Sequence, residues 1–369
     1  MKNTSSNEAR VLGIRRRHSL RLLAVLAAVT VSASACGGAG DATSKLPTSM
    51  DELVKQAQSE AEVAWSAPKP LEQMQPAIDL FEKKYPGIKV KYTNTKAPDQ
   101  VSQLKMEQAA RKVSVDVAAA GELTVPPSLD LADTVDWAAY GIDKDNVFFE
   151  DKAVYIWAAP KVWAYNKTMV SPADVPSTWD DLLKPRWKDG QIGAESRASF
   201  MTVWNLDPAL GEDKALTWAK DFAAQKPHFT PNTTQSEGLI ESGQVALGTS
   251  LINLVLQAQK SGAPVDIAPL SPTNTNETFI YMPKGAPHPA AAVLLTSFLS
   301  SDEAQAALAT TYNSRIPQET DCSNPDQSPV VKALCAANIT WHSTGTIEHY
   351  DDLAEFFPKA QKALGTDLG

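Results

Sequence analysis

The chain has 369 residues, with 34 lysines and arginines against 43 aspartates and glutamates, and a formal net charge of −9. Residues 1–35 hold six of the basic residues and one acidic residue, which leaves 28 basic and 42 acidic residues and a net charge of −14 for the rest. A chain this acidic is expected to be soluble and to avoid nucleic acids and anionic lipid surfaces, while its charge leaves the ligand class open.

Residues 1–35 have the parts of an export signal. Arginines, among them Arg16 and Arg17, precede the apolar run 22–31, and small residues follow it. The apolar run is much shorter than the roughly 20 residues that a membrane-spanning helix needs. We therefore predict a cleaved signal peptide over residues 1–35. Its export route stays open, because the arginine pair favours twin-arginine export whereas Ser19 departs from that pattern.

The segment Ala33-Ser34-Ala35-Cys36 resembles a bacterial lipobox, whose cysteine is acylated and becomes the new N-terminus. Two or three acyl chains, such as palmitate, would hold the protein at a membrane, since one chain binds only marginally. Ala33 stands where such boxes usually carry leucine, so secretion without an anchor is the alternative. Residues 36–48 have too little apolar content to fold, which predicts a lipidated Cys36 followed by a flexible tether.

Strand-like and helix-like patterns alternate from residue 62 onward. The first predicted elements are a strand at 62–65, a helix at 71–85, a strand at 88–92, a helix at 101–111 and a strand at 113–119. Further strands are predicted at 162–165, 191–194, 244–247, 265–270 and 278–282, and helices at 179–183, 199–204, 214–224, 234–242, 250–261 and 289–311. This rhythm favours doubly wound α/β sheets.

The folded part, roughly 320 residues, is longer than one hydrophobic core usually serves, so two lobes are expected. We predict the first part of lobe 1 at 49–160, lobe 2 at 161–270, and the second part of lobe 1 with C-terminal helices at 271–369. Cys322 and Cys335 lie close together in a polar segment. A disulfide between them is the interpretation that fits an exported protein, with two free thiols as the alternative.

Several short segments keep an order and spacing typical of one family. They are Phe81 to Val90, Val115-Asp116-Val117, Tyr165-Asn166-Lys167, Val175 to Leu183, Pro185 to Lys188, Glu241 to Ala246, His288 to Ala292 and Phe298 to Ser301. Together they resemble the ferric-binding-protein-type branch of the periplasmic binding proteins, which are solute receptors of ABC transporters. The resemblance spans most of the chain that follows the predicted signal peptide.

The resemblance implies a type II periplasmic-binding-protein-like fold, in which doubly wound mixed sheets form two α/β lobes joined by a two-segment hinge. We place the two crossing segments near residues 157–165 and 271–281. The resemblance also implies that the protein captures a small polar solute for an ABC permease and its ATPase, as a monomer without a cofactor. It would act outside the cytoplasm, lipid-anchored to the outer face of the cell membrane or periplasmic. A ligand-sensing lipoprotein without a transport role is an alternative.

Ligands of open α/β sheets bind beyond the carboxyl ends of the strands, where helix N-termini offer unpaired N–H groups. The residues predicted to bind ligand are Trp65, Ser66, Gly121, Glu122, Trp157, Ser196, Arg197, Ser199, Thr233, Thr234, Ser250 and Asn253. Hydroxyls at such places can equally be N-caps, and tryptophans can equally belong to the core. Arg197 beside two serines would form a fork for phosphate, sulfate or carboxylate, so an anionic organic solute is expected; a solvated surface arginine is the alternative.

Iron is the alternative ligand. Members of this branch that bind ferric iron use two consecutive tyrosines near the start of the helix that here begins at Ser250, and the matching positions are Ile252 and Asn253. Isoleucine cannot ligate a metal, and ferric iron prefers several anionic oxygens. We therefore expect an organic or oxyanion ligand and no metal bound directly by the protein.

Motifs of common enzymes do not occur in the sequence. There is no Gly-x-Ser-x-Gly elbow and no His-Glu-x-x-His pair, and the histidines are scattered. We predict that the chain is not an enzyme.

Overall fold

The computed structural model describes residues 46–206, 211–324 and 327–367. These residues belong to one compact unit. The predicted signal peptide, Cys36 and the tether up to residue 45 lie outside the described residues. Within the described ranges, every helix is too short or too polar to span a bilayer.

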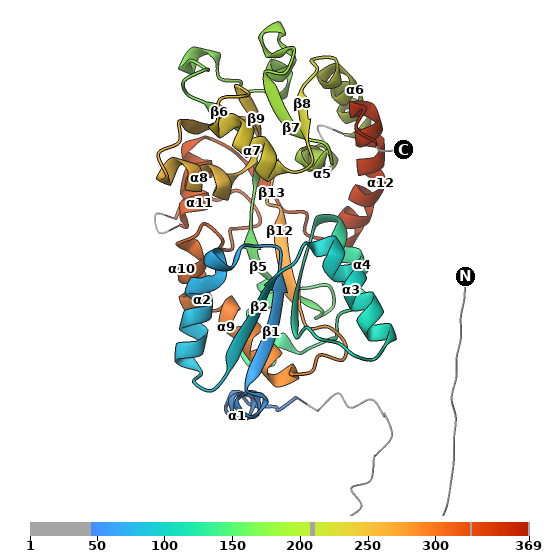
Figure 1. Ribbon diagram of the computed structural model, residues 1–369, viewed down its shortest axis with the longest axis vertical. Helices are drawn as coiled ribbons and strands as arrows, with labels where there is room; N and C mark the ends of the chain where they lie inside the picture. Colours follow the sequence, from blue (N-terminus) through green and yellow to red (C-terminus); the bar gives the residue numbers. More distant parts are fainter. Residues whose placement is uncertain (1–45, 207–210, 325–326, 368–369) are drawn as a thin grey trace, which may run out of the picture. The chain divides into compact units, whose positions relative to one another are not determined.

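Lobe 1 is built on a six-stranded mixed sheet with the strand order β2-β1-β3-β12-β5-β4 (Figure 1). Its strands are β1 Glu62–Ala67, β2 Lys89–Asn94, β3 Val117–Gly121, β4 Val147–Phe148, β5 Ala153–Ala158 and β12 Glu277–Tyr281. β1 runs parallel to β2 and β3, whereas β12 runs antiparallel to β3 and β5. Its helices are α1 Met50–Glu60, α2 Leu71–Lys84, α3 Ala97–Ala109, α4 Val125–Leu129, α9 Pro289–Ser300 and α10 Asp302–Ala309, with 3-10 helices at Glu122–Thr124, Trp137–Tyr140 and Lys144–Asn146.

The α2 helix shows how the sequence specifies lobe 1. Met74, Ile78 and Phe81 recur along one face and are buried, as the periodicity predicts. Lysines in the last turn complement the negative end of the helix dipole. Gly87, with φ of 98°, then turns the chain into β2, a conformation that glycine adopts without a steric penalty.

Lobe 2 is built on a five-stranded sheet with the order β10-β6-β9-β7-β8 (Figure 1). Its strands are β6 Lys161–Asn166, β7 Ile192–Glu195, β8 His228–Thr230, β9 Leu247–Leu251 and β10 Val265–Ala268. β9 is parallel to β7 and antiparallel to β6. Around this sheet lie α5 Thr202–Leu206, α6 Glu212–Ala223, α7 Thr233–Glu241, α8 Ile252–Lys260 and α11 Pro329–Ala336, with 3-10 helices at Pro172–Asp174, Trp179–Leu183, Pro185–Trp187 and Ser199–Met201.

An aromatic cluster fills the core of lobe 2. Trp218 stacks on Phe222 with ring centroids 4.8 Å apart, and Trp179 meets Trp218 edge to face at 5.3 Å. Trp163 and Trp204 extend the cluster. Such pairs add to the stabilisation that burial of their large apolar areas already gives.

Four of the predicted elements differ clearly from the observed ones. The single helix expected at 289–311 is divided into α9 and α10, because extended Ser301 ends the first and its hydroxyl caps the second. The segment 179–183 forms a 3-10 helix instead of an α-helix. The strand expected at 244–247 shares only Leu247 with the observed β9, which runs to Leu251, so the helix expected from Ser250 begins only at Ile252.

The chain passes twice between the two sheets. It leaves β5 at Ala158 and enters β6 at Lys161, and it returns from β10 to β12 through the short strand β11 Thr273–Asn274. These passages lie within the predicted crossing segments. The lobe boundaries themselves stay a prediction, because the C-terminal helices contact helices of both sheets: α11 packs against α8, and α12 Ile347–Leu364 packs against α4 and α6.

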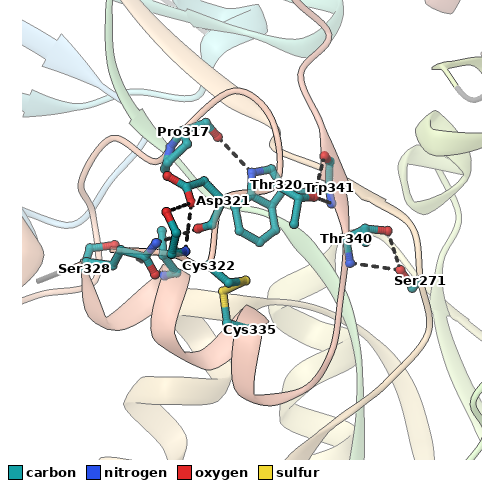
Figure 2. The surroundings of a disulfide bond; sticks show 12 residues. Ser271, Pro317, Thr320, Asp321, Cys322, Ser328, Cys335, Thr340 and Trp341 are labelled. Atoms are coloured by element: carbon teal, nitrogen blue, oxygen red, sulfur yellow. Dashed lines mark hydrogen bonds between the residues drawn. A yellow bond between two sulfur atoms is a disulfide. The ribbon is translucent and has the colours of Figure 1, made fainter. Parts of the chain in front are cut away.

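A disulfide joins Cys322 to Cys335 in the polar segment that precedes the last strand, β13 Trp341–His342 (Figure 2). The indole N–H of Trp341 donates to the Pro317 carbonyl at 2.8 Å. β13 in turn pairs with β11 between the two sheets. The disulfide therefore closes a loop that lies directly beside the returning crossing segment.

Candidate functional site

Four charged residues meet where the strands of the two lobes end, and we call them the interlobe ion cluster: Glu122, Lys161, Glu195 and Arg197. Glu122 follows β3 in lobe 1. In lobe 2, Lys161 is the first residue of β6, Glu195 is the last residue of β7, and Arg197 lies in the loop after β7. The Lys161 ammonium forms an ion pair with Glu122 Oε1. Arg197 Nη2 donates to Glu195 Oε2 at 3.1 Å.

The side chains of the cluster differ in how far they are exposed to solvent. The side chain of Glu195 is fully buried and that of Lys161 is 6% exposed, whereas that of Arg197 is 53% exposed. Buried charges are tolerated only when they are paired. The guanidinium of Arg197 therefore stabilises Glu195 while it still presents donors to solvent.

Electrostatics link the members of the cluster across the lobes. Burial disfavours the charged form of Glu122, but the positive charges of Lys161 and Arg197 outweigh it and hold the pKa of this carboxyl below its ordinary value. Burial likewise opposes the charge of Arg197, yet Glu195 and Glu122 raise its pKa. With all four groups charged, the cluster has no net charge. Arg197 is therefore paired with carboxylates of the protein and is not the isolated anion-binding fork that the sequence predicted.

Hydroxyl groups complete the surroundings of Glu195. Thr233 Oγ1 donates to Glu195 Oε2 at 2.9 Å, and Thr249 Oγ1 accepts from the Glu195 amide at 3.2 Å. Glu195 Oε1 has no hydrogen-bond partner among the described residues. A buried oxygen without a partner is an acceptor available to water or to a ligand.

Further unpartnered polar atoms lie on neighbouring elements of lobe 2. They are Ser199 Oγ, Asn253 Oδ1 and both carboxylate oxygens of Glu237, all on side chains that are at most 2% exposed. Burial raises the pKa of the Glu237 carboxyl to about 7, against the opposing effect of the nearby Ser250 hydroxyl. Lobe 2 therefore carries a set of buried oxygens at the ends of β7 and β9.

Several predicted ligand residues of lobe 1 lie inside the protein. Trp65 and Trp157 are 1% and 0% exposed and pack against each other with ring centroids 6.5 Å apart. Ser66 donates to Gln100 Oε1 at 3.4 Å. A Cβ at Gly121 would come within 3.1 Å of the Glu277 carbonyl, so this position has a steric reason to be glycine.

The remaining predicted residues lie in lobe 2. The Ser196 amide donates to the Thr230 carbonyl at 2.8 Å, and Thr234 lies exposed in the first turn of α7. Ser250 is buried, and its hydroxyl donates to the Leu251 carbonyl at 3.2 Å. The structure thus brings Glu122 and Arg197 into one network, with Thr233 bonded to it.

Sequence reasoning missed Lys161, Glu195 and Glu237. A sequence signal existed for the first two, because Lys161 stands at the predicted crossing and Glu195 directly precedes the predicted loop 196–199. Glu237 lies one turn into a predicted helix, where a glutamate normally faces solvent. Its burial depends on the packing of α7 against β9, which no local pattern predicts.

The described part of the chain contains no group of three or more His, Cys, Asp or Glu side chains placed to hold a metal ion. Ile252 and Asn253 occupy the start of α8 and are 0% and 1% exposed. The two positions that carry tyrosines in ferric-binding members of the branch are therefore buried in this protein.

Residues 77–337 match the model of the bacterial extracellular solute-binding proteins, and the chain belongs to this family. Solute-binding proteins are not enzymes, which confirms the prediction on catalysis. The chain is 32% identical to "Iron uptake protein A1" of Synechocystis sp. (strain ATCC 27184 / PCC 6803 / Kazusa) over 167 residues, 40% of this chain. The match covers 45% of that relative, so the chain spans less than half of its length.

Two solved structures illustrate the fold. The substrate-binding protein of an ABC transporter from Agrobacterium tumefaciens matches 84% of this chain and 96% of its own with a TM-score of 0.67 at 18% identity. The Trichodesmium protein IdiA (FutA), solved with iron and citrate ligands, matches 83% of this chain and 100% of its own with a TM-score of 0.63 at 19% identity. These likenesses confirm the predicted two-lobed α/β fold.

Proposed function

We propose that the protein is the solute-binding component of an ABC importer and that its cargo is ferric iron held in an anionic organic chelate. The observation that carries this proposal is the interlobe ion cluster, in which Arg197 offers exposed donors although the described residues contain no metal-binding group. The name of the Synechocystis relative supports iron as the element transported by that protein.

A bare ferric ion fits the site poorly. Ferric iron is hard and requires several anionic oxygens in its coordination shell. The two carboxylates of the cluster, Glu122 and Glu195, are each engaged by a cation of the cluster. The positions of the tyrosine pair carry Ile252 and Asn253. The chelator, and not the protein, therefore supplies most of the iron ligands.

An anionic chelator fits the donors of the cluster. The planar guanidinium of Arg197 can bind a carboxylate through two parallel hydrogen bonds, and Lys161 adds a compact positive charge. A chelator carboxylate would compete with Glu195 and Glu122 for these cations. Citrate is such a chelator, and it accompanies iron in the Trichodesmium protein of the same fold.

The mechanism is closure of the two lobes around the chelate. A chelate that contacts both lobes, with Arg197 as its contact on lobe 2, shifts the population toward the closed form. The closed form would then be presented to the permease. No covalent step is involved.

An organic anion without iron is the second candidate, and the fork of donors on Arg197 favours it. The two candidates differ in one requirement. The iron-free chelator alone should bind well if the anion is the cargo, whereas it should bind poorly if charge and shape of the ferric complex are recognised.

We also propose that the protein is exported by its signal peptide, anchored outside the cytoplasm through acylated Cys36, and active as a monomer with a permease and an ATPase. The arrangement of residues 1–36 supports the anchor. Mass spectrometry of the membrane-extracted protein should find Cys36 as an acylated N-terminus. An unmodified N-terminus at another residue would contradict it.

A thermal-shift comparison tests the ligand. Ferric citrate, citrate alone and ferric nitrilotriacetate are added to the purified protein, and a ligand at a hundredfold its Kd should stabilise the fold by about 2.7 kcal/mol. We expect the largest shift with ferric citrate and a reduced shift for Arg197→Ala. Arg186→Ala is the matched control, because Arg186 is a surface arginine that stacks on Trp187 outside the cluster. Equal shifts in both variants would contradict the site.

A further inference from the structure

The C-terminal segment 339–367, which we call the C-terminal strap, is fixed first to the crossing between the lobes. β13 pairs in parallel with β11, so that Trp341 lies opposite Thr273. The Thr273 amide donates to the Thr340 carbonyl at 2.9 Å. The Thr340 amide donates to Ser271 Oγ at 2.9 Å, and Figure 2 shows this bond beside the disulfide loop.

A buried carboxylate fastens the next residues of the strap. Glu277, the first residue of β12, is only 3% exposed. It accepts from the Ser343 hydroxyl, from the Thr344 amide at 3.1 Å and from the Tyr350 hydroxyl at 3.5 Å. The Thr275 hydroxyl, which lies outside the strap, also donates to Glu277. Because a buried carboxylate is costly without partners, removal of the strap would leave Glu277 with this one side-chain donor.

The α12 helix then crosses from lobe 1 to lobe 2. It packs against α4 and the 3-10 helix Glu122–Thr124 of lobe 1 and against α5 and α6 of lobe 2, and Figure 1 shows it running from beside α4 to beside α6. Its buried apolar residues belong to one continuous core cluster that also contains residues of both sheets. They are Tyr350, Leu353, Phe356, Phe357, Ala360 and Leu364.

The far end of the strap reaches the ligand loop. Thr366 Oγ1 donates to the Ser196 carbonyl at 2.7 Å, and Ser196 directly precedes Arg197. Lys359 Nζ forms an ion pair with Glu212 Oε1 at 2.9 Å, which fixes the same end to α6. The strap therefore connects the crossing, lobe 1 and the loop that carries the exposed guanidinium.

Pro358 lies inside α12 between these two groups of contacts. Proline lacks the N–H that would bond the Ala354 carbonyl, and helices bend at such positions. Tyr350 and Leu353 contact lobe 1 or the crossing before the proline, while Lys359 and Thr366 contact lobe 2 after it. The helix thus has a place to bend if the lobes move apart.

We propose that the C-terminal strap is a third connection between the lobes, which limits their opening and holds the Ser196–Arg197 loop in its ligand-binding position, with Thr366 as a positioning residue. This inference rests on the proposed ligand site at Arg197. The strap acts through Ser196 and touches no ligand itself.

Affinity measurements test the positioning role. Thr366→Val removes the hydroxyl at nearly constant volume, and it should raise the dissociation constant of ferric citrate about 2- to 10-fold, the usual effect of one lost hydrogen bond, mainly through faster dissociation. Thr366→Ser keeps the donor and should bind like the wild type. Thr217→Val is the control, because exposed Thr217 donates to the Asp213 carbonyl within α6. Equal affinity of Thr366→Val and wild type would overturn the positioning role.

The opening of the two lobes is measured separately, without any ligand. A wrong ligand assignment can then be distinguished from a wrong role of the strap. Spin labels are attached to cysteines introduced at exposed Lys105 in α3 and exposed Lys188 in lobe 2, in the full chain with Cys36→Ser. Pulsed electron resonance should give a longer and broader distance distribution for Lys359→Ala/Leu364→Ala/Thr366→Val, which also removes a buried apolar contact of α12, than for the parent. An unchanged distribution would overturn the strap even if ferric citrate binds, whereas a broader one supports it even if ferric citrate does not.

Discussion

The two lobes present different chemistry to the region between them. Beside the strand ends of lobe 1, the buried polar atoms without partners include the N–H donors Trp65 Nε1, Trp157 Nε1 and Gln100 Nε2, and one carboxylate, Glu122, pairs with Lys161 of lobe 2. Lobe 2 contributes both cations of the ion cluster and buried oxygen acceptors on Glu195 and Glu237. We therefore propose that recognition of the cargo is concentrated on lobe 2, while lobe 1 mainly closes over it.

The cores support this division. Phe200, which directly follows the loop 196–199, joins the aromatic cluster of lobe 2 through Trp218, whereas Trp65 in lobe 1 packs with Trp157 and Tyr92. Trp218→Ala and Trp65→Ala should each lower the free energy of unfolding by about 3–5 kcal/mol, since each leaves a large cavity. Denaturant titrations give these values. A loss below about 1 kcal/mol for Trp65→Ala would show that its ring is not a core element.

The disulfide supports the lobe 2 side of the crossing. Replacement of Cys322 and Cys335 by serine should lower the free energy of unfolding by about 3 kcal/mol, the chain-entropy estimate for a loop of about 15 residues. Chemical denaturation with and without reductant gives the measurement. A double variant as stable as the wild type would show that the loop is held by its hydrogen bonds alone.

The buried carboxylate of Glu237 should make lobe 2 sensitive to pH. Its pKa is about 7 in the folded protein, above its ordinary value of 4.5. The unfolded chain therefore loses its proton first as pH rises, and this group lowers stability between about pH 4.5 and 7. The loss approaches about 3 kcal/mol and then levels off.

Glu237→Gln is the matched variant, because it keeps the shape and removes the titration. The difference in unfolding free energy between wild type and variant should change across this pH range and stay constant above about pH 8. Parallel profiles from about pH 4 to about pH 8 would contradict the burial of an ionisable acid at this position.

Arg197→Ala should weaken ferric citrate binding about 10- to 100-fold, the scale of a lost hydrogen bond to a charged group. Isothermal titration at two salt concentrations should also show a weaker salt dependence for the variant, because one cation is gone. A comparable loss in Arg186→Ala would indicate a general charge effect and not a site on lobe 2.

The smallest effect is expected at the exposed end of the strap. Lys359 and Glu212 are 47% and 39% exposed, so their ion pair should contribute no more than about 0.2–1 kcal/mol to stability. Lys359→Ala should therefore leave the unfolding midpoint nearly unchanged. A loss of several kcal/mol would mean that this pair, and not the apolar face of α12, holds the strap in place.

Local patterns predicted β1 to β3, β6, β7, β10 and β12, most of the helices between them and the position of the loop at Arg197, but they missed β4, β5, β8 and α1. The periodicity of residues 71–85 and the short apolar strands specify their elements without tertiary information. The crossing segments were also accessible, because the family resemblance places them. These features depend on neighbours in the sequence or on a whole-chain pattern.

The partners within the site were not accessible in the same way. Glu122 pairs with Lys161 across 39 positions in the sequence, and Glu195 shares Arg197 with this pair only after both sheets have formed. The periodicity of a helix such as α12 predicts that one face is buried. It does not identify the helices of the two lobes against which that face packs. A tryptophan at a strand end can line a cleft or pack in the core, and Trp65 and Trp157 both pack in the core.

Equilibrium dialysis with radioactive iron and radiolabelled citrate tests the central claim most directly. The protein is dialysed against ferric citrate, and the retained iron and citrate are counted together for wild type and Arg197→Ala. Recognition of a chelate by lobe 2 requires that both labels are retained together and that both fall in the variant. Iron retained without citrate, or citrate retained equally well without iron, would contradict it.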